Sequence, residues 1–151
     1  MNDTSILKTG GKFKIFIKLL IAVCMIGCAP QISHFSPIAY EQATSLKVDS
    51  LVLMGKAAES YTDHEEEISG LMNRVEKSYE YAKGRPHNEY SARQWEILKD
   101  PDRNLLGGFM KRWEDQGKLS PTFINEAKRL ISDAYDTIIG LESRKIKPPK
   151  E

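Results

Sequence analysis

Apolar residues recur at helical spacing, without a change of phase, from residue 37 to residue 83. Two series of apolar residues recur at intervals of seven positions along this stretch, the second with one interval of fourteen: Met54, Tyr61, Ile68, Val75 and Ala82, and Leu51, Ala58, Met72 and Tyr79. A loop inside the stretch would normally shift such series out of register. The pattern therefore predicts one long helix over about residues 37–83, on the order of 70 Å at 1.5 Å per residue.

Both ends of this predicted helix carry boundary signals. Ser36 can accept a hydrogen bond from a free backbone amide, and Pro37 fits the first helical position. Gly84, with a proline two residues later, is typical of a helix end. One alternative stays open, because Thr62 and Glu65 could form a capping box and divide the stretch into two helices with a kink near residue 62.

Three further helices follow, each with an apolar side. Residues 91–99 begin with Ser91 and Gln94 in a capping-box spacing and carry the apolar residues Trp95 and Leu98. Asp100-Pro101-Asp102 is expected to start a second short helix, which carries Leu105, Leu106, Phe109, Met110 and Trp113. Ser120-Pro121 begins the last helix, at about residues 121–143, with Ile124, Ile131 and Ile138 on its apolar stripe.

The expected fold class is all-α, because no alternating pattern of useful length indicates a strand. The long helix packs against two short helices and a C-terminal helix that runs antiparallel to it. We expect one helical domain over residues 37–143, followed by a polar, proline-bearing and disordered tail at 144–151. No repeat of 30–45 residues is present, which argues against a solenoid.

The N-terminal region has the layout of an export signal. Lysines 8, 12, 14 and 18 precede a short apolar run, Leu19 to Ile26, which ends in Gly27 and Cys28. A basic flank, a short apolar core and a small residue are the parts of a secretory signal peptide. The run is much shorter than the roughly 20 residues that a membrane-spanning helix needs. An uncleaved N-terminal anchor or an ordinary signal peptide is the alternative.

Met25-Ile26-Gly27-Cys28 resembles the lipobox of bacterial lipoproteins, a likeness that covers residues 1–29 only. The resemblance implies a signal peptide at 1–27 that is cleaved between Gly27 and Cys28. It also implies diacylglycerol on the Cys28 sulfur, an acyl chain on its amino group, and a lipidated tether at 28–36. Two or three chains make a stable membrane anchor. With Ala29 rather than Asp after Cys28, enteric-type sorting favours the outer membrane, facing the periplasm.

Charge and cysteine content narrow the function classes. The chain has 22 basic and 21 acidic residues, of which residues 1–27 hold four lysines and one aspartate, so 18 basic and 20 acidic residues follow. A near-neutral chain without a basic block gives no electrostatic case for nucleic acid as a partner. Both cysteines, Cys24 and Cys28, lie in the signal region, so the exported domain has no disulfide and must be stabilised by packing.

No motif predicts a metal site or an enzyme. His34, His64 and His87 lack a second ligand at zinc spacing, and we expect solvated polar residues there. Asp100 could begin a calcium loop, but its sixth position is a leucine and its twelfth a lysine. The acidic run Glu65–Glu67 is expected on the solvent-exposed face of a helix. Apart from the lipid on Cys28, we expect no cofactor and no catalytic residues.

Two features remain as candidate sites. Gly107 and Gly108 lie inside a predicted helix. Two glycines there lower the stability of the helix by roughly 1–2 kcal/mol relative to two alanines. The glycine pair predicts either close approach of the long helix or contact with a ligand or a partner backbone. Tyr81, Tyr90 and Arg85 fall off the apolar stripe or in a turn, so they are candidates for partner contact. Trp95, Phe109 and Trp113 are expected in the core.

These observations support two functions. The first is a lipid-anchored envelope lipoprotein that acts as a helical interaction or structural module, docking on another envelope protein or on a second copy of itself. The alternative is a lipoprotein that binds a small ligand between helices near Gly107 and Gly108. An envelope enzyme is the third and weakest hypothesis, because a thin helical bundle rarely presents a pocket without a cofactor.

Overall fold

The computed structural model describes residues 33–147, and this range contains helices and loops but no strand. The all-α prediction is confirmed. The predicted signal peptide, Cys28 and most of the tether lie outside the described residues, as do residues 148–151 of the tail. The elements are α2 (Pro37–Gly55), the short 3-10 turn η1 (Tyr61–Asp63), α3 (Glu65–Gly84), α4 (Glu89–Lys99), α5 (Leu106–Gln116) and α6 (Pro121–Glu142).

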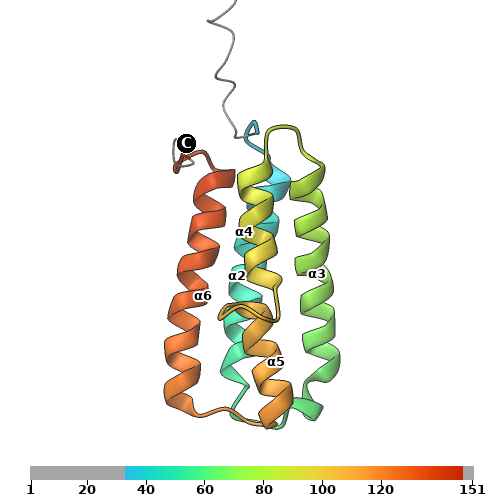
Figure 1. Ribbon diagram of the computed structural model, residues 1–151, viewed down its shortest axis with the longest axis vertical. Coiled ribbons are helices and arrows are strands. Elements are labelled where there is room, and N and C mark those ends of the chain that lie inside the picture. Colours follow the sequence, from blue (N-terminus) through green and yellow to red (C-terminus); the bar gives the residue numbers. More distant parts are fainter. Residues whose placement is uncertain (1–32, 148–151) are drawn as a thin grey trace, which may run out of the picture. The chain divides into compact units, whose positions relative to one another are not determined.

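The helices form an up-and-down bundle of four columns (Figure 1). Helix α2 packs against α3 and α6, and α4 packs against the same two helices, so the four close a ring around the core. Helix α5 continues the α4 column after a loop. The start of α2, the α3–α4 turn and the end of α6 lie at one end of the bundle, called the first end below; the opposite end is the second end.

The prediction of one long helix is wrong. Helix α2 ends at Gly55, a turn and η1 occupy residues 56–64, and α3 then returns along the bundle as the second arm of a helical hairpin. The alternative of two helices divided near residue 62 is confirmed as to the division. The chain reverses direction there rather than bending, however, and α3 begins after His64 without the capping box. The apolar register survives because the loop also packs inward: Ala57 is fully buried and Tyr61 is half-buried against the core.

Two of the predicted helix starts are confirmed by their caps. The Ala39 amide donates to Ser36 Oγ at 3.2 Å, and the Phe123 amide donates to Ser120 Oγ at 3.3 Å, with proline at the first helical position in both cases. Each cap satisfies an amide that the helix itself leaves free. The predicted end of the C-terminal helix near residue 143 also agrees with the structure.

The short helices begin elsewhere than expected. Helix α4 starts at Glu89, so Ser91 lies inside its first turn and is buried instead of capping it. Helix α5 starts at Leu106, because residues 100–105 form a loop in which Asp100 Oδ1 accepts a hydrogen bond from the Asp102 amide at 2.9 Å. Asp followed by proline starts a turn here, since an aspartate side chain bonded two residues on stabilises a turn as well as a helix cap.

The core runs the length of the bundle and contains the predicted aromatic residues. Trp95, Phe109 and Trp113 are at most 3% exposed, which confirms their assignment to the core. Tyr135 of α6 joins them, with its ring edge-on to Trp95 at 6.0 Å and its hydroxyl 2.8 Å from Ser50 Oγ of α2. This pair satisfies two polar groups that the interior would otherwise leave unbonded.

The end of α6 is closed by the first residues of the predicted tail. Arg144 adopts a left-handed backbone (φ 62°), and its amide donates to Leu141 O at 3.0 Å. The Ile146 amide then donates to Gly140 O at 3.0 Å, and the Ile146 side chain lies against Gly140. Residues 144–147 thus have a definite course over the helix end. Among the described residues, no helix is long and apolar enough to cross a membrane.

Candidate functional site

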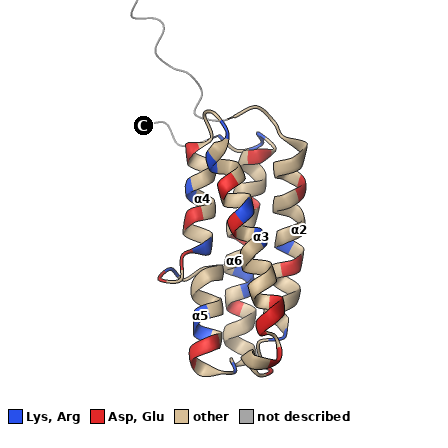
Figure 2. Ribbon diagram, turned by 90° about the vertical axis from the view of Figure 1, so that its right-hand side faces the viewer, with Lys and Arg blue, Asp and Glu red and all other residues tan. Residues whose placement is uncertain are grey.

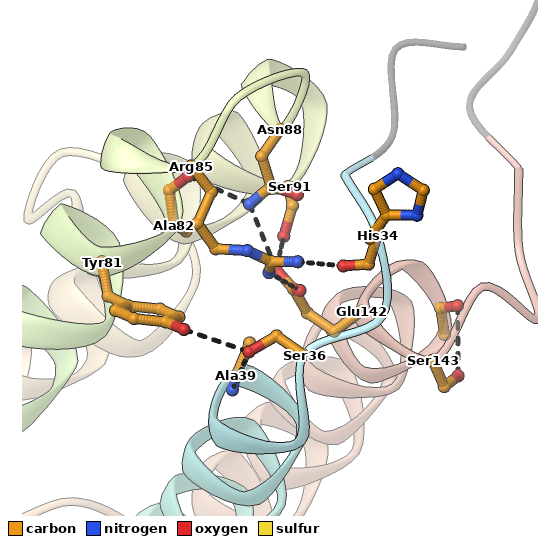
Figure 3. Close-up of polar contacts among 11 residues, drawn as sticks. His34, Ser36, Ala39, Tyr81, Ala82, Arg85, Asn88, Ser91, Glu142 and Ser143 are labelled. Carbon is orange, nitrogen blue, oxygen red and sulfur yellow. Dashed lines mark hydrogen bonds and ion pairs between the residues drawn. The ribbon is translucent and has the colours of Figure 1, made fainter.

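A buried carboxylate stands at the first end of the bundle. Glu142, in the last turn of α6, has a side chain only 1% exposed and forms an ion pair with Arg85, which follows α3. It also accepts hydrogen bonds from Ser91 and, at 3.4 Å, from Asn88 Nδ2 (Figure 3). A charge so buried is stable only when it is paired and bonded. This cluster, Arg85, Asn88, Ser91 and Glu142, fastens α6 to the α3–α4 turn.

Two of the three predicted partner-contact residues make contacts around this cluster. Arg85 also donates to the His34 carbonyl, and its guanidinium lies 5.9 Å from the centre of the Tyr81 ring. The Tyr81 hydroxyl lies 3.1 Å from Ser36 Oγ, the cap of α2 (Figure 3). Arg85 is only 12% exposed in its side chain. Both residues therefore tie the incoming chain to the bundle, while the half-buried Tyr90 stays a candidate for partner contact.

The glycine pair has a local structural role. A Cβ atom on Gly107 would lie under 3.0 Å from the backbone of Lys99 and Asp100, and one on Gly108 would meet the Arg103 carbonyl oxygen. The close approach is made by the α4–α5 loop and not by the long helix we expected. Glycine is needed because the loop backbone passes directly over the start of α5.

A groove does lie beside these glycines, between α5 and α6. Its volume is about 350 Å³, and Gly108 is on its wall. The rings of Phe109 and Phe123 stack there, 5.9 Å apart and nearly parallel, and Leu130 is half exposed at the edge. The lining is apolar with charged residues at the rim: Arg112, Glu126 and Arg129. Apolar walls with a few polar groups are typical of small-molecule sites.

Helix α2 exposes a row of apolar side chains that our sequence analysis did not single out. Ile38, Val48 and Val52 are 54%, 60% and 61% exposed. Their spacing puts them on one side of the helix, whereas Ala43, Leu46 and Leu53 line the core. Two grooves, of about 370 and 440 Å³, flank this α2 row where α2 meets α3. Apolar residues on two sides of a helix are the signal that could have revealed the row.

Charged residues of α3 border the α2 row. Arg74 pairs with Asp49 of α2 at 3.1 Å and separates the two grooves, which both touch it. At the second end, Lys56 pairs with Glu67 at 2.7 Å, and the hydrogen bond from Lys56 holds the pKa of Glu67 below its ordinary value. The acidic run at the start of α3 is exposed as expected, in the first turn, where the positive end of the helix favours it.

His64 is the one histidine whose environment differs from our expectation. It is 9% exposed, with Nε2 at 2.7 Å from Glu59 and its ring 5.7 Å from that of Trp113. It is therefore a packed residue of the second end, whereas His34 and His87 are exposed. Within residues 33–147, no group of three or more histidine, cysteine or acidic side chains is arranged to hold a metal ion.

The sequence patterns we used could not reveal the burial of Glu142 or its ion pair with Arg85. Glu142 lies at the polar end of a helix, and nothing in its neighbourhood along the chain indicates burial. Arg85, its partner, is 57 residues away. Only the ring of helices brings them together.

Compared with protein-family models, curated proteins and solved structures, the chain matches none of them.

Proposed function

We propose that the protein is a lipid-anchored lipoprotein of the bacterial envelope that acts as a helical protein-interaction module. The lipid anchor rests on the lipobox-like residues 25–28. The observation that carries the interaction is the exposed α2 row, Ile38, Val48 and Val52. Exposed apolar rows beside grooves mark surfaces that another molecule covers.

The occupant we propose is the apolar face of a helix in another envelope protein. Residues 38, 41, 45, 48 and 52 are separated by three or four positions, so they form one seam along α2 that a second helix can follow. Glu41 lies in this seam. Two copies anchored in one membrane leaflet and paired side by side would bring their Glu41 side chains together, which disfavours self-association. A partner helix with a basic residue opposite Glu41 would avoid this repulsion.

Photo-cross-linking in intact cells tests the interaction. A cross-linking amino acid at Val48 or Val52 is expected to give one dominant adduct of defined mass. The same amino acid at Glu96, exposed on α4, is the control and is expected to give none. Identical adducts from all three positions, or none from Val48 and Val52, would contradict the proposal. An adduct of twice the chain mass would show self-association instead.

A matched pair of variants then tests the chemistry of the row. Val48→Thr preserves the shape of the side chain, whereas Val48→Asp places a charge in the apolar seam. With the cross-linker at Val52, we expect the Val48→Asp adduct to fall at least tenfold and the Val48→Thr adduct to fall much less. The anchor is tested separately: the Cys28→Ser protein should leave the membrane fraction, and its retention there would refute the lipid anchor.

A second candidate function rests on the groove between α5 and α6. Apolar walls with Arg112 and Arg129 at the rim suit an amphiphile that carries an anionic head group. We expect a long-chain fatty acid to raise the unfolding temperature of the protein. Leu130→Glu, which puts a negative charge at the edge of the groove, should abolish this shift. A fatty acid that stabilises the wild type and the variant equally would exclude the groove as its site.

A further inference from the structure

We infer that the first end of the bundle is a membrane-contacting face that rests on the head groups of an anionic lipid surface. The inference builds on the proposed lipid anchor and adds an orientation and a lipid chemistry to it. Its residues are Phe35, Tyr40 and Ile146, which are apolar or aromatic and exposed, and Arg144, Lys145 and Lys147, which are basic and exposed. This set is called the membrane face below.

The apolar part of the membrane face comes from the segment before α2, the first turn of α2 and the segment after α6. Phe35 is 50% exposed, Tyr40 38% and Ile146 42%. Phe35 and Tyr40 have their ring centres 6.3 Å apart, so they present one aromatic surface at the start of α2. Aromatic rings with a polar edge favour the boundary between lipid and water.

The segment that follows α6 matches an anionic surface in its charge. Residues 143–147 contain three exposed basic side chains and no acid, and the one acidic residue before them, Glu142, is already neutralised by Arg85. The opposite end carries the exposed acidic residues Glu59, Asp63, Glu65, Glu66 and Glu67. Figure 2 shows red positions at that second end, and red positions also occur along the rest of the bundle. Anionic lipids would therefore attract the segment that follows α6 and repel the second end. The exposed acids Glu41 and Glu89 also lie at the first end and oppose part of this attraction.

Chain length keeps the first end of the bundle close to the membrane. Cys28 precedes Ser33 by five residues, which reach at most about 18 Å even when fully extended. The first end therefore cannot leave the head-group region by more than about that distance. Helix α2 then adds roughly 28 Å before its last residue. A probe at the far end of α2 would thus lie well outside the membrane in the orientation we infer.

A depth measurement on single-cysteine variants tests the inference. The mature chain has no cysteine other than Cys28, so one introduced thiol can carry a fluorophore. The lipidated protein is placed in vesicles of phosphatidylcholine with one-third phosphatidylglycerol and nitroxide-labelled lipid. We expect strong quenching for probes at Phe35→Cys and Ile146→Cys. Val52→Cys, 61% exposed near the far end of α2, is the control and should be quenched several-fold less.

Three outcomes separate the inference from the anchor on which it rests. Stronger quenching at residues 35 and 146 than at residue 52 supports the membrane face. Equal quenching at all three positions, in protein that floats with the vesicles, overturns the membrane face and leaves the anchor intact. Protein that does not float with the vesicles overturns both.

A charge reversal tests the lipid chemistry. The variant Arg144→Glu/Lys145→Glu/Lys147→Glu, with the probe at Phe35→Cys, should lose at least half of the quenching in anionic vesicles. In vesicles of phosphatidylcholine alone, the variant and its parent should behave alike. Unchanged quenching in the anionic vesicles would refute the attraction to anionic lipid. Circular dichroism of the variant checks that the bundle is still folded.

Discussion

Glu142 and Arg85 show how one buried charge can determine the geometry of a helix end. The carboxylate has no access to water, so its stability depends on Arg85, Ser91 and Asn88 remaining in place. Three segments meet at this point: the end of α6, the α3–α4 turn and the first turn of α4. The ion pair therefore contributes mainly to the alignment of these helices, and less to the strength of their packing.

We predict that Glu142→Ala lowers the free energy of unfolding by roughly 3 kcal/mol, because it leaves Arg85 buried without a counter-ion. Urea denaturation followed by circular dichroism measures the change. The control is Asp136→Ala, which breaks the exposed Lys47–Asp136 pair at 2.6 Å, where the aspartate is 58% exposed. That variant should lose less than about 1 kcal/mol, since water screens the pair. Equal losses would show that the Glu142 cluster is not a buried ion pair in solution.

Tyr135 gives the molecule a defined sensitivity to alkali. Burial raises the pKa of its phenol well above the ordinary value of 10, although the hydrogen bond from Ser50 acts in the opposite direction. The unfolded chain therefore releases this proton above pH 10, while the folded chain keeps it. The contribution of Tyr135 to the free energy of unfolding is fully present below pH 10. It decreases as the pH rises beyond that value, by roughly 1.4 kcal/mol per pH unit.

We predict that Tyr135→Phe makes the free energy of unfolding less dependent on pH between pH 9 and 11. At neutral pH the same variant should lose about 1 kcal/mol, because Ser50 is left buried without a partner. The double variant Ser50→Ala/Tyr135→Phe should recover part of that loss, which makes it the control for the hydrogen bond. An alkaline slope unchanged from the wild type would show that Tyr135 titrates normally.

At the scale of elements, the helical content and most helix ends could be predicted, but the reversal after Gly55 could not. The seven-residue spacing from Met54 through Ile68 to Val75 reports burial, and it continues because both arms of the hairpin face one core. Periodicity alone does not distinguish a straight helix from a hairpin whose loop also packs inward. The three glutamates at 65–67 were the available signal, since acidic residues favour the first turn of a helix.

Some glycines of the bundle are covered by loop backbone and others face open space, and this difference can be tested. Gly107→Ala and Gly108→Ala should each lower the free energy of unfolding by about 1–3 kcal/mol, because the new Cβ meets loop backbone that cannot move aside cheaply. Gly70→Ala is the matched control within α3. A Cβ there meets nothing within 4 Å, so the helix should gain about 0.5–1 kcal/mol.

Thermal unfolding of the three glycine variants measures these effects together. The expected order of stability is Gly70→Ala above the wild type, and both α5 variants below it. A Gly107→Ala protein as stable as the wild type would mean that the α4–α5 loop does not lie over the start of α5. The glycine pair would then again be free to contact a ligand or a partner backbone.

At the scale of the whole molecule, the candidate surfaces were less predictable than the core. Trp95 and Trp113 could be assigned because large aromatic residues at helical spacing are usually buried. Arg85 was predicted to contact a partner, because it falls in a turn off the apolar stripe, and its buried partner Glu142 is distant in sequence. The α2 row was overlooked because its residues were compared only with a core stripe. Surfaces depend on which side of each helix is left uncovered, and this is settled only by the packing.

The bundle is closed at both ends by contacts between distant segments. At the first end these are side-chain contacts around Glu142, and at the second end they are backbone hydrogen bonds between loops. The Leu119 amide donates to Ala57 O at 2.8 Å, and the Tyr61 amide donates to Gly117 O at 2.9 Å. Trp113 stands beneath them, with Nε1 donating to Glu59 O at 3.1 Å. We therefore expect the second end to unfold together with the rest of the bundle, although it consists of loops.

We predict that the amides of Leu119 and Tyr61 exchange with solvent only when the whole bundle unfolds, because separating these loops requires α2, α5 and α6 to move apart. Native-state hydrogen exchange measures this directly. The control is the Arg103 amide, which donates at 3.2 Å within its own turn to Asp100 O and can open locally. Leu119 should be protected as strongly as the core of α6, and Arg103 far less. If Leu119 exchanges as fast as Arg103, the second end opens independently, and α2 and α6 are held together only by the core and the Glu142 cluster.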